Sequence, residues 1–282
     1  MQFISSTAGT TPVVLDSPHS GTHYPQDFGY VCELATLRRA EDTHVEKLYQ
    51  FAPALGCAWI EAHFPRSYLD ANRNTSEVDF DMLADHWPHA GASSDPAVLS
   101  KLRLGKGLIW RITDDGMPLY GRRLSVPEVE DRIANCWLPY HAAVGAAIDA
   151  AHARHGYSIH INCHSMPAIA SSHATDYPGL AHADFVLGNR DHTTASQALV
   201  EQMKAQLVAL GYSVEINHPY KGVELVRRYG NPAQNRHSVQ VEINRKLYMH
   251  EDTLEMHAGF AALQVNLQQM VQQLLTTDPR KL

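Results

Sequence analysis

Short apolar runs rich in β-branched and aromatic residues alternate along this chain with segments whose apolar residues recur at helical spacing. The strand-like runs cover residues 11–16, 57–63, 157–163, 184–187, 212–217 and 238–243. Helices are expected over residues 38–55, from Ser125 to about 155, and over about 194–210 and 253–276. This alternation predicts an α/β fold, a three-layer α/β/α sandwich with a mixed, largely parallel sheet.

The chain has 282 residues, of which 44% are hydrophobic, enough for a substantial core. No Gly/Ser linker, charge block or repeat divides it, so we expect a single domain over residues 1–282. Residues 74–123 have poor periodicity and frequent Gly, Pro and Asp, with a possible β-hairpin around Gly116. We expect a long excursion there, and such loops usually have a functional reason, such as covering a site.

The net charge of −7 and the absence of a Lys/Arg-rich run argue against nucleic acid or an anionic membrane as a partner. The N-terminus lacks the basic and apolar regions of a secretory signal, and no apolar run approaches the roughly 18 residues of a spanning helix. The four cysteines form no CxxC pair. We therefore expect a cytoplasmic protein. The sequence does not fix its oligomeric state.

Polar residues follow several of the expected strands, where ligands collect in α/β sheets. The first strand ends at Asp16 and His19, and the strand over 157–163 runs into His164. Histidine is the commonest metal ligand, and a catalytic zinc takes three ligands from His and Asp/Glu. His19 and His164 are therefore candidates.

A third ligand should be acidic. Glu41 and Asp42 open the helix expected over 38–55, and we prefer Asp42, although an acid in a first helical turn also suits the helix dipole. Zinc is the expected ion, but two histidines and a carboxylate also suit Fe, Co or Mn.

Glu242 lies in an otherwise apolar strand and is the candidate general base, because burial would raise the pKa of a carboxyl group toward neutrality. Alternation puts Glu242 on a polar face of its strand, which could line a cleft or meet solvent. Arginine suits the binding of a substrate carboxylate. Arg73 is the best candidate because Asn72 lies beside it. The other arginines in these segments are Arg66, Arg227, Arg228 and Arg245.

Six sequence blocks, in order over roughly residues 12–248, resemble the N-formylglutamate amidohydrolases (N-formylglutamate deformylases) of histidine degradation. The blocks are Asp16-Ser17-Pro18-His19-Ser20-Gly21-Thr22-His23-Tyr24-Pro25, Glu41-Asp42-Thr43-His44-Val45, Pro65-Arg66-Ser67-Tyr68-Leu69-Asp70-Ala71-Asn72-Arg73, Cys163-His164-Ser165-Met166-Pro167, Pro219-Tyr220-Lys221-Gly222 and Glu242-Ile243-Asn244-Arg245.

That family is similar in fold to the zinc carboxypeptidases, a phosphorylase/hydrolase-like sandwich. The resemblance implies one zinc ion, substrate-binding residues and a general base. The implied zinc ligands are His19, Asp42 and His164, the implied carboxylate-binding residues are Asn72 and Arg73, and the implied base is Glu242. Arg66 and Arg245 are further substrate-binding candidates within the matching blocks.

Two departures stand out. Thr22 occupies the position where zinc carboxypeptidases carry their acidic ligand, so that ligand must come from elsewhere. Asn162 stands where we expect an aspartate in close relatives, and its neutral amide could alter how His164 is oriented.

The implied activity is metal-dependent hydrolysis of N-formyl-L-glutamate, a small acidic substrate, to L-glutamate and formate. An alternative is a related zinc amidohydrolase that acts on another N-acyl or N-formyl amino acid. A metal-free enzyme with Ser20 or Ser165 as nucleophile is a weaker alternative, since neither lies in a GxSxG motif. An inactive metal-binding protein is the third alternative, which the retention of Glu242 and both histidines disfavours.

Overall fold

The structure is a computed structural model that describes residues 2–89, 95–171 and 177–282. Its internal contacts group the chain into two compact units. Unit 1 comprises residues 1–5, 18–41 and 62–142, and unit 2 comprises residues 6–17, 42–61 and 143–282. The single domain expected over residues 1–282 stays a prediction.

Within the described residues the strands form one seven-stranded sheet in the order β1-β3-β2-β4-β7-β5-β6. Parallel pairing joins β2 to β3 and to β4, β4 to β7, and β5 to β6, whereas β5 runs antiparallel to β7. The expected mixed, largely parallel sheet is therefore confirmed. The strands are β1 (Ile4–Thr7), β2 (Val13–Ser17), β3 (Ala58–Ala62), β4 (Ser158–Met166), β5 (Phe185–Gly188), β6 (Val214–Ile216) and β7 (Arg236–Asn244).

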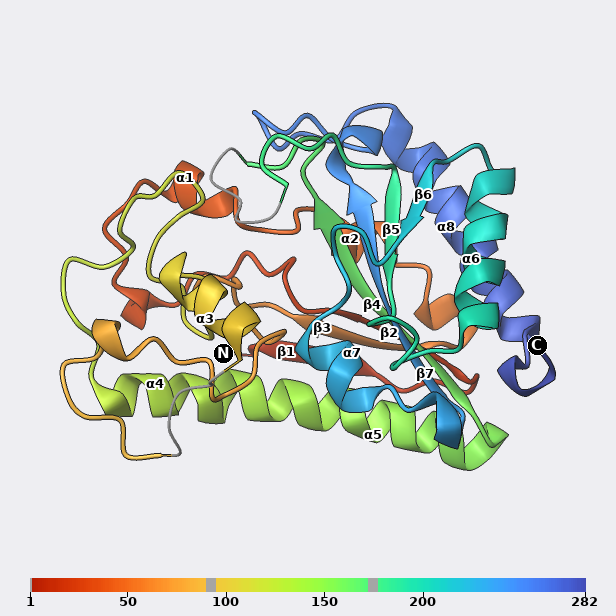
Figure 1. Ribbon diagram of the computed structural model, residues 1–282, viewed down its shortest axis with the longest axis horizontal. Helices are drawn as coiled ribbons and strands as arrows, with labels where there is room; N and C mark the ends of the chain where they lie inside the picture. The colour runs from red at the N-terminus through yellow and green to blue at the C-terminus, as the bar shows by residue number, and fades with distance from the viewer. Residues whose placement is uncertain (1, 90–94, 172–176) are drawn as a thin grey trace. The chain divides into compact units, whose positions relative to one another are not determined.

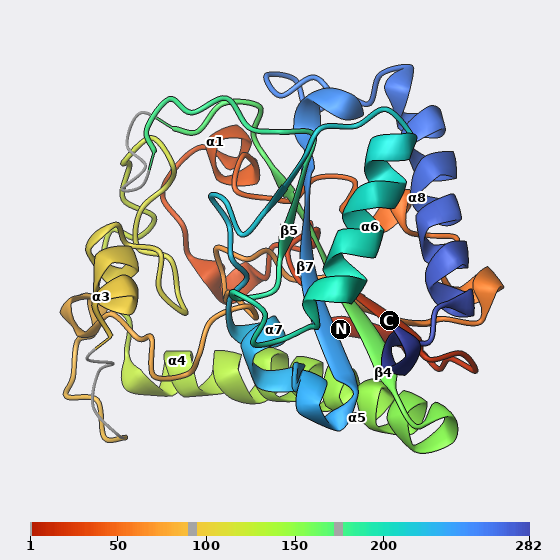
Figure 2. The same ribbon diagram turned by 45° about the vertical axis from the view of Figure 1, so that its right-hand side comes forward.

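One face of the sheet in unit 2 carries the apolar core. Alternate residues of the central strands, such as Leu15, Ile161 and Val241, are buried there against three helices. These helices are α2 (Val45–Leu48), α6 (Gln197–Ala209) and α8 (Gly259–Thr276). In Figures 1 and 2, α6 and α8 lie side by side along this face.

The opposite face of the same strands is polar but equally buried. Helix α7 (Glu224–Tyr229) packs on β4 and β7 there. Helix α5 (Leu138–His155) approaches α7 so closely that a Cβ added to Gly145 would lie 3.3 Å from the ring of Tyr229. Helices thus cover both faces of the sheet, which confirms the α/β/α fold class. The buried polar residues on this face are Asp16, His160, Asn162, His164, Ser238, Gln240 and Glu242.

Unit 1 has less regular structure. Its helices are α1 (Leu34–Arg38), α3 (Pro96–Arg103) and α4 (Val126–Arg132), and a π-helical turn, Ile133–Trp137, joins α4 to α5. Ser125 caps α4, in a capping box with Glu128. Arg132 is buried in the centre of an aromatic cluster, with its guanidinium carbon 4.1 Å from the ring centre of Tyr68.

The helix predicted over residues 38–55 is wrong. Helix α1 ends at Arg38, and α2 covers only Val45–Leu48, so Asp42 lies in a turn between two short helices. The physical reason is His44, whose left-handed backbone (φ 68°) is incompatible with a continuous helix. Apolar periodicity cannot reveal such a break.

Smaller differences concern other elements. The strand expected to end before His164 continues to Met166, and helices α3 and α7 and strand β1 were not predicted. The hairpin expected around Gly116 is confirmed by the antiparallel bridge between Ile112 and Pro118. Part of the predicted excursion, residues 90–94, lies outside the described residues.

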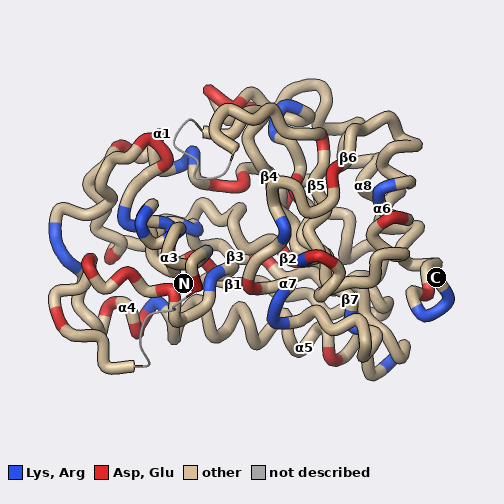
Figure 3. The backbone as a smooth tube through the Cα atoms, in the orientation of Figure 1, with Lys and Arg blue, Asp and Glu red and all other residues tan. Residues whose placement is uncertain are grey.

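In the part of the chain that the structure describes, no helix combines the length and apolar character that crossing a membrane requires. Acidic and basic positions are interspersed along the backbone (Figure 3).

Candidate metal centre

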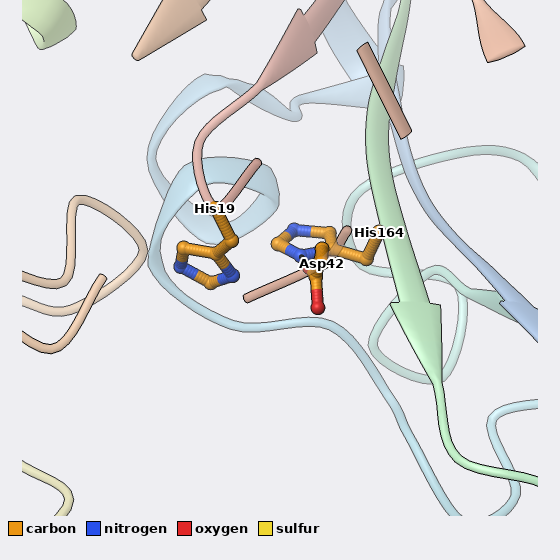
Figure 4. Close-up of side chains that lie close together, drawn as sticks. All are labelled: His19, Asp42 and His164. Atoms are coloured by element: carbon orange, nitrogen blue, oxygen red, sulfur yellow. Dashed lines mark hydrogen bonds and ion pairs between the residues drawn. The ribbon is translucent and has the colours of Figure 1, made fainter. Parts of the chain in front are cut away.

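Three buried residues from distant parts of the sequence bring potential metal ligands together. His19, Asp42 and His164 each offer a ligand atom, and these atoms all lie within 4.8 Å of one another. The three residues are 1%, 0% and 2% exposed. Figure 4 shows the two imidazoles with the Asp42 carboxylate beside them. Two histidines and one carboxylate form the ligand set of many catalytic zinc sites, so the donor chemistry fits a divalent ion.

The sheet explains why the histidines meet. His19 follows the end of β2 by two residues, and His164 lies within β4. Strands β2 and β4 are parallel neighbours, with Asp16 paired to Asn162, so their carboxyl ends reach the same edge of the sheet.

His19 is oriented by a buried carboxylate. Its Nε2 donates to Asp70 Oδ1 at 2.6 Å. The same oxygen accepts the Asn72 backbone N–H at 2.9 Å, and Asp70 Oδ2 accepts from Arg66 at 3.0 Å. Burial alone would raise the pKa of Asp70, but its neighbours His19 and Arg66 hold this pKa well below its usual range. An ionised acceptor at Nε2 fixes the tautomer of His19 so that Nδ1 is the nitrogen suited to a metal.

His164 is oriented by a neutral amide instead. Its Nε2 donates to Asn162 Oδ1 at 2.7 Å. The Asn162 amide nitrogen donates to Asp16 Oδ1 at 2.9 Å, which fixes which way the amide points. Asp16 Oδ1 also accepts from His160 Nε2 at 2.8 Å. His164 Nδ1 lies 3.0 Å from Asp42 Oδ2, so His164 turns Nδ1 toward Asp42.

The second Asp42 oxygen is held by Arg245, whose Nη2 lies 3.3 Å from Oδ1. Arg245 Nε also donates to Ser165 Oγ at 3.1 Å. The alternative acidic candidate, Glu41, accepts the Tyr24 hydroxyl at 2.6 Å and pairs with Arg38. The cluster of potential ligands contains Asp42 and not Glu41.

Glu242 lies beside His164 in the sheet. The two residues are register partners across β4 and β7, so their side chains leave the same face of the sheet. Glu242 is buried, and the Gln240 side-chain amide donates to its Oε1 at 2.7 Å. The polar face of β7 therefore does not meet solvent.

The remaining candidates lie in unit 1. Arg66 pairs with Asp70, and its guanidinium carbon lies 5.0 Å from the ring centre of Trp110. Arg73 Nε donates to the Lys106 carbonyl at 3.2 Å. Asn72, two residues after Asp70 in the sequence, is also buried.

Sequence reasoning missed several polar residues around these candidates. Lys106 lies 3.6 Å above the Trp110 ring, and burial lowers its pKa. Asp70, the partner of His19, stands in one of the recognised blocks but was given no role. His160 follows no motif and could not have been found from spacing.

Comparison with known proteins assigns the family. The family model of N-formylglutamate amidohydrolase matches residues 11–249. The chain is 30% identical to an N-formylglutamate deformylase of Pseudomonas aeruginosa, covering 89% of this chain and 86% of that protein. It is 28% identical to an N-formylglutamate deformylase of Pseudomonas putida, covering 97% and 96%.

A solved structure is also similar. The crystal structure of N-formylglutamate amidohydrolase from Ralstonia eutropha JMP134 superposes with a TM-score of 0.92 at 40% identity, covering 100% of both chains. The match of the family model over most of the sequence and the agreement of the relatives lead to one conclusion: this chain belongs to the N-formylglutamate amidohydrolase family.

Proposed function

We propose that the protein hydrolyses N-formyl-L-glutamate to L-glutamate and formate with the help of one divalent ion, zinc, held by His19, Asp42 and His164. The observation that carries this proposal is the buried cluster of their ligand atoms within 4.8 Å of one another. The names of the relatives, N-formylglutamate deformylase, support the substrate. We further propose a place in histidine degradation, as the resemblance implies, and a location in the cytoplasm.

A divalent ion bound by these residues would supply a Lewis acid for the amide carbonyl and make water acidic enough to attack near neutral pH. Glu242 is the proposed base. It accepts a proton from the attacking water and delivers it to the departing nitrogen as the C–N bond breaks. Arg245 holds one oxygen of Asp42, which keeps the other directed at His164.

The substrate carries two carboxylates, so a protein with a net charge of −7 needs local cations to bind it. Arg66, Asn72, Arg73 and Arg245 are the proposed substrate-binding residues. Arg66 and Arg245 already pair with Asp70 and Asp42. Arg73 is favoured for a substrate carboxylate because its own ion pair, with Glu77 at 3.9 Å, is longer than these two.

The main alternative is a different acyl amino acid. Formate release from N-formylglutamate should be compared with formate release from N-formylaspartate and acetate release from N-acetylglutamate. A serine nucleophile is disfavoured because Ser165 Oγ bonds to Arg245 and approaches Asp42 at 3.5 Å, which gives it no imidazole base in these contacts.

The test of the mechanism is Glu242→Gln. The amide preserves shape but cannot accept a proton, so turnover should fall by about 10²–10⁴-fold, the range for general acid–base catalysis, while the metal content stays at the wild-type value. Glu215→Gln, at an exposed position of β6, is the matched control and should behave as wild type. Metal content is measured by elemental analysis and turnover by formate release. Full activity of Glu242→Gln would show that Glu242 is not the base.

A further inference from the structure

Three buried side chains of one helical segment hold three backbone carbonyls of one loop. We call residues Tyr68 to Arg73 the Asp70 loop. Trp137 Nε1 donates to the Arg73 carbonyl at 2.8 Å, and His141 Nε2 donates to the Ala71 carbonyl at 2.8 Å. Arg132 Nη1 donates to the Tyr68 carbonyl at 3.1 Å. All three donor residues are at least 95% buried.

The π-helical turn makes this arrangement possible. Arg132 precedes the turn Ile133–Trp137, and Trp137 is its last residue. At about 100° per residue, two positions five apart in a regular α-helix point roughly 140° away from each other. The wider π turn, with hydrogen bonds from i to i+5, brings such positions closer to the same side of the helix. His141, one α-helical turn further, stacks on Trp137 with ring centres 3.8 Å apart.

The Asp70 loop matters because of the carboxylate at its centre. Asp70 Oδ1 accepts from His19 Nε2 and from the Asn72 backbone N–H. The Asp70 backbone N–H is tied to the Leu108 carbonyl at 2.8 Å. Leaving a buried carbonyl without its donor is unfavourable, so the loop is expected to shift when a donor is lost. A shift of the loop displaces the carboxylate that orients His19.

We propose that Trp137 and His141 are positioning residues for His19, acting through the Asp70 loop. They touch neither substrate nor metal. Their hydrogen bonds hold the loop, the loop holds Asp70, and Asp70 accepts from His19 Nε2, which leaves Nδ1 as the nitrogen suited to a metal. The inference rests on the proposed function in taking His19 as a ligand and Asn72 and Arg73 as substrate-binding residues. Because Asn72 and Arg73 belong to the same loop, substrate binding should depend on the same two donors.

The test uses variants that keep an aromatic ring at the position and remove the N–H donor. Trp137→Phe and His141→Phe should each weaken zinc affinity roughly 3–10-fold, less than the 10–100-fold typical of losing a direct partner of a ligand. The KM for N-formylglutamate should rise, while kcat at saturating zinc and substrate stays near the wild-type value. His141→Gln, whose side-chain amide can still donate, should restore both quantities.

Trp59→Phe is the matched control. Trp59 is also a buried tryptophan, and its Nε1 donates to Glu61 at 3.2 Å within unit 2, at a residue to which no catalytic role is assigned here. Zinc affinity is measured by competition with a chelator, and stability by thermal unfolding. Wild-type affinity and KM in both Trp137→Phe and His141→Phe would overturn the proposal. So would an equal loss of affinity in Trp59→Phe, because a general structural effect would then suffice.

The chelator competition measures zinc affinity whether or not the protein hydrolyses the substrate. If the wild-type protein releases no formate from N-formylglutamate but the two variants still bind zinc more weakly, the proposed function fails and the positioning role stands. If formate is released normally by all variants and their zinc affinities are unchanged, the positioning role fails and the proposed function stands.

Discussion

The two histidines of the candidate metal centre are oriented by different chemistry. His19 lies in a loop and donates directly to the carboxylate of Asp70. His164 lies in a central strand and donates to the neutral amide of Asn162, which in turn donates to the carboxylate of Asp16. Both arrangements end in a buried carboxylate, but one of them interposes an amide.

The difference follows from where each histidine stands in the fold. In strand β4, Asn162 is paired with both β2 and β7 and His164 is paired with Glu242 of β7, so the sheet itself fixes the backbone of both residues. The segment that carries Asp70 has no such ladder. A direct charge strengthens the bond to His19, and the surrounding contacts from Arg66 and the Asp70 loop supply the rigidity that a sheet would give.

The largest expected effect comes from removing either imidazole. His19→Ala and His164→Ala should each abolish stoichiometric zinc binding and lower turnover on the order of 10³-fold or more, since a three-ligand site loses a ligand. Equilibrium dialysis with elemental analysis and formate release measure the two effects. His250→Ala, at an exposed position, is the control.

The zinc content of these two variants also tests whether His19 and His164 are equivalent ligands. Both alanine variants should lose zinc to the same degree if the two histidines are equivalent ligands. Stoichiometric zinc in one variant and not in the other would show that only one imidazole belongs to the metal site.

The sequence allowed the ligands to be predicted better than their partners. His19 and His164 could be found because each is next to or within an apolar run that reads as a strand, and parallel strands deliver their ends to one edge. Asp70 is 51 residues from His19, and Asp16 is 144 residues from His160. Such pairs depend on tertiary packing and leave no spacing in the sequence.

Backbone irregularities escaped prediction for a related reason. Residues 125–155 were predicted as one continuous helix, and the apolar pattern does not reveal the π-helical turn Ile133–Trp137 within it. Likewise, the left-handed conformation of His44 ended a helix that its neighbours favour. In both places tertiary contacts decide the local geometry, whereas the regular strands followed their own pattern.

An intermediate effect is expected from exchanging the two kinds of partner. Asp70→Asn removes the charge beside His19 and should weaken zinc binding about 10–100-fold. Asn162→Asp places a second carboxylate against Asp16, where the amide nitrogen now lies 2.9 Å from Oδ1, and like-charge repulsion should lower both stability and zinc affinity.

The double variant Asp16→Asn/Asn162→Asp separates charge from geometry. It restores one carboxylate and one amide in reversed order and gives His164 a direct carboxylate, as His19 has. Chelator competition should return zinc affinity to the wild-type value or above, and thermal unfolding should show recovered stability. If Asn162→Asp alone is as stable as wild type, the contact with Asp16 does not orient the amide.

The smallest expected effect is on the pH dependence of stability, and it concerns the buried His237. In its observed hydrogen bond this imidazole accepts a backbone N–H, whereas His19 and His164 donate to side-chain oxygens. His237, in β7, accepts the Ser196 backbone N–H at Nδ1, at 3.1 Å, and burial lowers its pKa from 6.5 to about 4. The folded pKa lies below the unfolded one, so the stability from neutral His237 is complete above pH 6.5 and is lost as the pH falls toward 4.

In His237→Gln this loss of stability at low pH should be absent. Between pH 7 and pH 4.5, wild type should lose about 1–2 kcal/mol more unfolding free energy in urea than this variant. An exposed control, His250→Gln, should follow wild type. If wild type and His237→Gln lose the same unfolding free energy between pH 7 and pH 4.5, burial of His237 does not make its protonation unfavourable. His237 could then no longer serve as the comparison for His19 and His164.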